Sequence, residues 1–162
     1  MIMNRKWIVP LIIGCGALCL VAALVVVLGG AAFFRWMMEE PENVNIQVDA
    51  PIMATMGETV TLQVSIENLA AEPQLLDSID IADSYLEGLG IQRADPPFTE
   101  SYPLGLVDYQ SFTFQRDIPA GETLNVQFYV VATRIGDWSG DIDVCIGSGS
   151  VCSTFIVRTV VE

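Results

Sequence analysis

A run of 28 residues without a charged side chain, Trp7 to Phe34, constrains this chain more than any other feature. As an α-helix it would extend about 42 Å, and the hydrocarbon core of a bilayer needs only about 20 apolar residues. We therefore expect residues 7–34 to form one transmembrane α-helix, a signal anchor whose first partner is the lipid bilayer. The chain then divides into a head (residues 1–6), this helix, an acidic linker (residues 35–43) and a soluble module (residues 44–162).

The charges on either side of the run indicate the orientation of the chain. Arg5 and Lys6 precede it together with the N-terminal amine, whereas Arg35 alone follows it before a group of acidic residues. Flanks rich in Lys and Arg stay on the cytoplasmic side of a membrane. We therefore predict a single-pass protein of the cell membrane, with a cytoplasmic N-terminus and an extracytoplasmic C-terminal module.

Two other interpretations of the same run stay open. Gly30-Ala31-Ala32 resembles a cleavage site for signal peptidase, and cleavage there would release a secreted domain. The apolar core of a signal peptide spans about 7–15 residues, however, and this run is longer. Residues 12–15 (IIGC) resemble a bacterial lipobox with Cys15 as the lipidated residue, but the apolar run continues well past that cysteine.

The soluble module is strongly acidic. All 20 acidic residues lie after residue 38 and only four arginines follow Trp36, which gives residues 36–162 a formal charge of −16. Such a field repels nucleic acid, and it suits a basic partner, divalent cations or plain solubility. The chain has no histidine, and its one lysine, Lys6, precedes the apolar run. We expect no enzymatic activity, because nucleophilic and general-base catalysis lack their usual groups.

The module alternates apolar and polar residues with a period of two, as in Val60, Leu62, Val64 and Ile66. This alternation is typical of half-buried strands. The strand segments are residues 44–48, 60–67, 75–81, 86–93, 109–116, 124–130, 142–146 and 151–159, so that seven or eight strands form, depending on whether residues 86–93 pair. Turns are expected at 119–122, 136–137 and 147–150, a loop at 98–108, and no helix. An all-β module, an antiparallel Ig-like β-sandwich, follows from this spacing.

Two short motifs carry a resemblance to a known class of module. Residues 57–62 (GETVTL), with Asn68 ending the strand, and residues 118–124 (IPAGETL) resemble the strand starts of bacterial Ig-like surface modules. The module is similar in this respect to the cell-adhesion-related domain of bacteria (CARDB) and to conserved-repeat domains. The resemblance implies an Ig-like fold over residues 44–160 and implies little about activity.

Cys145 and Cys152 bracket the last turn of the module. Counting outward from Ser148-Gly149 places the two cysteines opposite each other on neighbouring strands, both on the outward face. An oxidising exterior then favours a structural disulfide. The alternative is a thiolate metal site, which lacks two further ligands.

Acidic and aromatic residues suggest a ligand-binding module as an alternative function. Two sets of aspartates could bind Ca²⁺, although neither matches the spacing of an EF-hand loop: Asp77, Asp80 and Asp83, and Asp137, Asp141 and Asp143. Trp138 and Tyr129 could form a platform for a sugar ring, although strand aromatics more often pack. We expect no bound cofactor, with calcium or a glycan as the alternative ligand.

Taken together, these patterns favour a non-enzymatic interaction or structural module at a bacterial cell surface. A short linker would hold it beside the bilayer, where a neighbouring membrane or envelope protein is the nearest partner. An exposed strand edge or the 98–108 loop would make the contact. Phe98, Tyr102 and Leu104 are the interaction candidates, because they are apolar for a surface segment.

Overall fold

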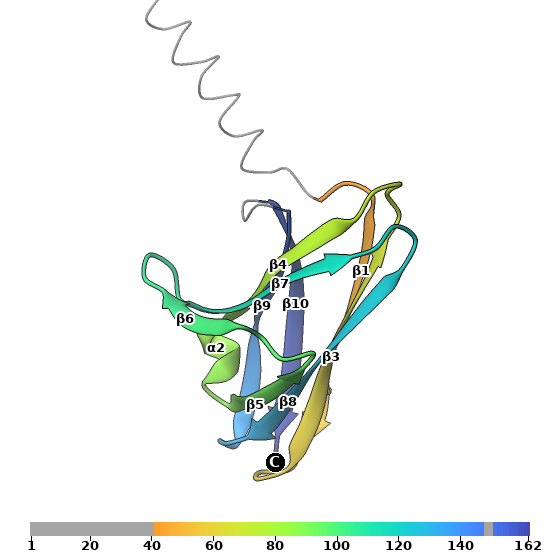
Figure 1. Cartoon of the computed structure of the whole chain (residues 1–162). Helices are drawn as coiled ribbons and strands as arrows, with labels where there is room; N and C mark the ends of the chain where they lie inside the picture. Colours follow the sequence, from red (N-terminus) through yellow and green to blue (C-terminus); the bar gives the residue numbers. More distant parts are fainter. Residues whose placement is uncertain (1–40, 148–150) are drawn as a thin grey trace, which may run out of the picture. The chain divides into compact units, whose positions relative to one another are not determined.

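Two β-sheets pack face to face in the computed structural model, which describes residues 41–147 and 151–162 (Figure 1). The predicted all-β sandwich is therefore confirmed for this part of the chain. The predicted membrane helix, residues 7–34, lies outside the described residues. Among the residues that are described, no helix is both long and apolar enough to cross a membrane.

The two sheets differ in size. The four-stranded sheet has the order β1 (Val44–Asp49), β3 (Thr59–Asn68), β8 (Thr123–Ala132) and β5 (Leu89–Asp95). The six-stranded sheet has the order β2 (Met53–Ala54), β10 (Val151–Val161), β9 (Gly136–Ile146), β4 (Gln74–Ala82), β7 (Tyr109–Ile118) and β6 (Glu100–Leu104). The chain passes repeatedly from one sheet to the other, for example between β3 and β4 and between β8 and β9, an arrangement typical of Greek-key sandwiches.

The apolar half of each alternating pattern forms the core. Leu62, Val64 and Ile66 of β3 are fully buried, and the residues between them are half-buried. Phe128 of β8 meets the ring of Phe112 edge-to-face at 5.4 Å between centroids, across the space between the sheets. The hydrophobic face predicted for these strands is therefore the face that the fold buries.

Four details differ from the sequence prediction. Ten strands are found in the described residues instead of seven or eight, because β2 and β6 are added and β6 occupies five of the eleven residues of the predicted 98–108 loop. The sandwich is not wholly antiparallel, since β2 pairs in parallel with β10. The predicted turn at 136–137 is the start of β9, and the chain turns just before it. A helix, α2 (Asp83–Leu86), is present, but its four residues are too few to show a helical period.

The sandwich has two ends, which we name after one residue at each. At the Asn68 end, the Gly121 amide donates to the Asn68 carbonyl at 3.0 Å and ties the β7–β8 turn to the end of β3. At the Trp138 end, the Thr133 amide donates to the Gly88 carbonyl at 2.8 Å and ties the β8–β9 turn to the connection after α2. These two ends frame every candidate site below.

Candidate functional site

The predicted disulfide between Cys145 and Cys152 is confirmed. The two residues are register partners on β9 and β10, with Cα atoms 4.0 Å apart and the sulfurs bonded. Cys145 lies on the predicted outward face, where its sulfur is 3.7 Å from an oxygen of Asp80, but neighbouring residues cover it and only 3% of the residue is exposed. It lies in an inner strand of the six-stranded sheet, where Ser78 of β4 flanks it on one side and Cys152 on the other.

Three aspartates share the outer face of the six-stranded sheet: Asp80 of β4 and Asp141 and Asp143 of β9. Each carboxylate accepts a hydrogen bond from a hydroxyl on another strand of the sheet. Ser111 donates to Asp80 at 2.6 Å and Thr154 donates to Asp143, in both cases from the adjacent strand, whereas Tyr109 of β7 reaches across β4 and donates to Asp141 at 3.3 Å. The carboxylates therefore link strands of this sheet, which is a structural role.

The pKa changes on this face follow from burial and from the closely spaced carboxylates. Burial raises the pKa of Asp143, the Thr154 hydrogen bond lowers it, and the neighbouring Asp80 and Asp141 charges raise it, so that the net change is upward. Burial, with the Asp143 and Asp141 charges, raises the pKa of Tyr109 to about 12. Both changes have one cause: a further negative charge on this face is unfavourable.

The remaining calcium candidates are dispersed. Asp137 forms a fork with Arg158, with 2.7 Å between its Oδ1 and the arginine Nε, and this pairing lowers the pKa of Asp137. Asp77 accepts a hydrogen bond from Gln115, and Asp83 begins α2. Within residues 41–147 and 151–162, no group of three or more acidic, histidine or cysteine residues could hold a metal ion. The sequence grouped these aspartates by chain proximity, whereas Asp80 lies across the sheet from Asp143 because β4 and β9 pair.

The two aromatic candidates for a sugar platform have other partners. Trp138 is half-buried against the core, and its indole N–H donates to the Arg134 carbonyl at 2.9 Å. The guanidinium of Arg134 lies 4.9 Å from the centre of the Trp138 ring, and that of Arg93 lies 3.3 Å from the centre of the Tyr129 ring. Cations cover both rings, and the rings lie on different sheets, so the structure does not bring them together as one platform.

The β6–β7 hairpin carries the interaction candidates in unequal ways. Phe98, just before β6, packs edge-to-face on Phe112 with ring centroids 5.2 Å apart and is partly buried against the core. The expectation that Phe98 is a surface residue is therefore wrong. Leu104 is half-buried, and Tyr102 is 46% exposed.

Sequence reasoning missed the most exposed apolar residues of this hairpin. Leu106 is 100% exposed and Val107 is 54% exposed at the turn between β6 and β7. Their position next to Gly105 and Asp108 marks a turn, and a turn predicts exposure, so the signal was present in the sequence. With Tyr102 they give the hairpin three exposed apolar side chains.

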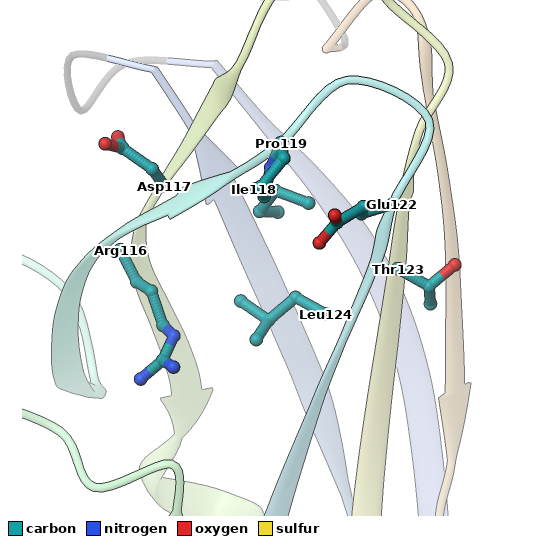
Figure 2. A pocket seen from close by; sticks show the side chains of 7 residues that line it. All are labelled: Arg116, Asp117, Ile118, Pro119, Glu122, Thr123 and Leu124. Carbon is teal, nitrogen blue, oxygen red and sulfur yellow. The ribbon is translucent and has the colours of Figure 1, made fainter.

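A hollow of about 260 Å³ lies between the two sheets at the Asn68 end (Figure 2). It is lined by Arg116, Asp117, Ile118, Pro119, Glu122, Thr123 and Leu124, from the end of β7, the following turn and the start of β8. In Figure 2 the side chains of Ile118 and Leu124 lie between the two ribbons, and that of Asp117 points away. The surface of the hollow is therefore more polar than apolar, because Ile118 is almost fully buried and Leu124 is half-buried.

Asn68 holds the turn beside this hollow in place. Its side-chain amide is fully buried and donates to the carbonyls of Ile118 at 2.8 Å and Glu72 at 2.9 Å, and its Oδ1 accepts from the Ala70 amide at 2.8 Å. A buried amide with its partners satisfied fixes backbone that no strand ladder holds. The rim of the hollow is therefore a defined surface.

The fold and these sites define an all-β sandwich module. No protein-family model matches the chain, and no curated protein matches its sequence. Among solved structures, the cupredoxin domain of amoB from Nitrosocaldus yellowstonii is similar at 10% identity with a TM-score of 0.47, covering 76% of this chain and 89% of that one.

Two further solved structures are similar at the same level. A cohesin module from a Clostridium perfringens family 33 glycoside hydrolase has 10% identity and a TM-score of 0.43, covering 74% of this chain and 98% of that one. The Escherichia coli alpha-2-macroglobulin activated by porcine elastase has 17% identity and a TM-score of 0.46, covering 74% of this chain but 9% of that one. At this distance the likeness concerns the β-sandwich alone.

Proposed function

We propose that this protein is a membrane-anchored, non-enzymatic interaction module at a bacterial cell surface. In this proposal residues 7–34 form the anchor, and the sandwich is an extracytoplasmic Ig-like domain of the kind that its GETVTL and IPAGETL motifs resemble. The Greek-key crossings of the two sheets support the Ig-like assignment. A neighbouring membrane or envelope protein is the partner, because the linker is short and the module stays near the bilayer.

The observation that carries the proposal is the exposure of apolar side chains at the tip of the β6–β7 hairpin. Leu106 is completely exposed and Val107 is more than half exposed, next to the partly exposed Tyr102. Apolar side chains exposed together on one hairpin of an acidic domain suit a contact with another protein. β6 is also an edge strand, whose Pro103 lacks an amide N–H, so side chains rather than strand addition make this contact.

The experiment is a chemical crosslinking capture from native membranes with the full chain. The double substitution Leu106→Ser/Val107→Ser removes the apolar tip and leaves β6, Phe98 and the core in place. We expect the captured partner to be lost. The matched control is Ile156→Ser, which removes a side chain that is 83% exposed on β10, far along the sheet from the hairpin.

The control variant keeps the partner if the hairpin is the contact. A partner captured equally by the hairpin variant and the wild-type chain would overturn the proposal for this surface. The topology is tested separately by adding protease to intact cells, which should remove the sandwich. Protection of the sandwich in intact cells would contradict the extracytoplasmic assignment, and its release into the medium would favour the cleaved, secreted alternative.

A further inference from the structure

Strand β8 has a strand neighbour on both sides over only part of its length. β3 pairs with it from Thr123 to Val131, whereas β5 pairs with it only from Gln127 to Ala132. β5 ends at Asp95 because Pro96, which has no amide N–H, follows it. Within residues 41–147 and 151–162, the segment 123–126 therefore has a partner on one side and an open edge on the other.

The hydrogen-bonding direction along β8 follows from the bonds at its two ends. Just before β8, the Glu122 carbonyl accepts from the Asn68 amide at 2.9 Å, so even-numbered residues bond toward β3. Just after it, the Thr133 amide donates to the Gly88 carbonyl at 2.8 Å, so odd-numbered residues bond toward the β5 side. The two ends agree, since these directions alternate strictly along an antiparallel strand.

This alternation identifies the groups on the open edge. The N–H and C=O of Thr123 and of Asn125 face away from β3 and into the space that β5 leaves empty. The same residues have exposed side chains, while the side chains of Leu124 and Val126 turn inward. An open edge with spaced donors and acceptors is a template for another extended chain.

The hollow between β7 and β8 adjoins this open edge. Its volume of about 260 Å³ lies below the range of about 300–1,000 Å³ that small-molecule sites occupy, and it suits a side chain of a bound peptide. The half-buried Leu124 supplies apolar surface to the hollow, and polar and charged residues supply most of the rest. Strand addition takes affinity from main-chain hydrogen bonds and selectivity from a pocket for alternate side chains, and both features are present here.

Charge decides which extended chain fits. Residues 41–162 hold 18 acidic residues and four arginines, so the domain as a whole is strongly negative, while Arg116 and Glu122 both line the hollow. A second copy of this domain carries the same negative charge and is repelled. A segment that alternates apolar and basic residues places an apolar side chain against Leu124 and its cations in the acidic field of the domain.

We propose that the open edge of β8 at Thr123–Val126, with the adjoining hollow, binds an extended basic peptide segment of a partner protein as an added strand. This inference deepens the interaction function proposed above and rests on it, but it uses a surface separate from the β6–β7 hairpin. The added strand would lengthen the four-stranded sheet at the Asn68 end, in line with β5.

The test uses the full chain in detergent and a fluorescein-labelled ten-residue peptide of alternating lysine and valine as the probe. Fluorescence anisotropy measures binding, and amide NMR shifts locate it. We expect saturable binding that weakens as salt rises, with the largest shifts at Thr123 and Asn125. The same peptide carrying N-methyl groups on alternate residues should bind about tenfold more weakly, because it loses edge hydrogen bonds.

Two variants of one residue provide the matched control. Asn125→Pro removes the amide donor from the edge and should weaken binding about tenfold, whereas Asn125→Ala keeps the donor and should bind like the wild type. If Asn125→Pro fails to fold, the N-methylated peptide on the wild-type chain decides the question.

The proposal would be overturned if the N-methylated and unmodified peptides bound equally well. It would also be overturned if a glutamate–valine peptide of the same length bound as well as the lysine–valine peptide, or if self-association of the chain caused the shifts at Thr123. The Leu106→Ser/Val107→Ser variant separates this inference from the hairpin proposal. It should lose the captured membrane partner and keep peptide binding if both proposals hold, and loss of peptide binding in that variant would contradict the β8 assignment.

Discussion

At the Trp138 end of the sandwich β8 is hydrogen-bonded on both sides, whereas at the Asn68 end it has one strand neighbour. The Trp138 end is closed by packing: Tyr85 of α2 is fully buried, its hydroxyl lies 2.8 Å from that of Thr159, and Trp138 lies over Gly88. At the Asn68 end two separate interactions fix the backbone: the hydrogen bonds of the buried Asn68 amide and the disulfide between β9 and β10.

The same strand is therefore covered at one end of the fold and open at the other. At the Trp138 end β5 occupies the side of β8 that faces away from β3, so no further strand can pair with β8 there. A buried amide and a disulfide fix the backbone without filling the side of the sandwich. The Asn68 end therefore keeps an ordered but unpaired edge, which is what strand addition requires.

The largest effect is expected at the closed end, from Gly88→Ala. A Cβ at this position would overlap the indole ring of Trp138, which its hydrogen bond to the Arg134 carbonyl holds in place. Overpacking of this kind costs about 3 kcal/mol in the free energy of unfolding, measured by urea denaturation. The control is Gly90→Ala, where the nearest atom is the Thr133 methyl carbon at an ordinary 3.5 Å. Equal stability of the two variants would show that Trp138 does not close this end.

The next largest effect is expected from the disulfide at the Asn68 end. Replacing Cys145 and Cys152 together by alanine should lower the free energy of unfolding by about 2.5 kcal/mol, the chain-entropy value for a loop of about eight residues. Treatment of the wild-type chain with dithiothreitol should lower the free energy of unfolding by the same amount. Mass spectrometry of the unreduced protein provides the direct check, and free thiols at both positions would contradict the structure.

Removal of the buried amide tests the second tie of the open end. Asn68→Ala leaves the Ile118 and Glu72 carbonyls without their donor and should cost about 2 kcal/mol. Asn45→Ala is the matched control, because its amide makes one exposed bond to Glu67 and its loss should cost less than about 0.5 kcal/mol. If Asn68→Ala left the free energy of unfolding unchanged, strand pairing alone would order the β7–β8 turn.

The smallest effect is a pH dependence on the outer face of the six-stranded sheet. The raised pKa of Asp143 means that its contribution to stability is complete below its ordinary value of 3.8 and is lost as pH rises through the higher folded value. Asp143→Asn should therefore raise the melting temperature by a few degrees at pH 7, and this gain should vanish near pH 3.

Asp137 provides a control of opposite sign for the pH experiment. Its pKa is lowered by the hydrogen bond and charge of Arg158, so its contribution is present above 3.8 and is lost as pH falls through the folded value. Asp137→Asn should lower the melting temperature slightly at pH 7 and have no effect at low pH. Parallel pH profiles for the two variants would contradict the assigned causes.

The features that depend on neighbours along the chain could be predicted from the amino-acid pattern. Alternation from Val60 to Ile66 predicts which face of β3 is buried, because successive strand residues point to opposite sides. The turn between Cys145 and Cys152 likewise predicts their pairing, since a hairpin aligns residues at equal distances from its centre. The all-β class and eight of the ten strands followed from such local patterns.

Which strands lie side by side, and which residues each side chain contacts, follow from long-range contacts. β4 lies between β7 and β9, so Asp80 joins Asp141 and Asp143 rather than Asp77, and Phe98 packs partly buried on Phe112. The open edge of β8 arises in the same way, since it depends on where β5 stops pairing. The order of the strands in a sheet results from contacts between residues far apart in the chain, and the periodicity of a local segment does not predict those contacts.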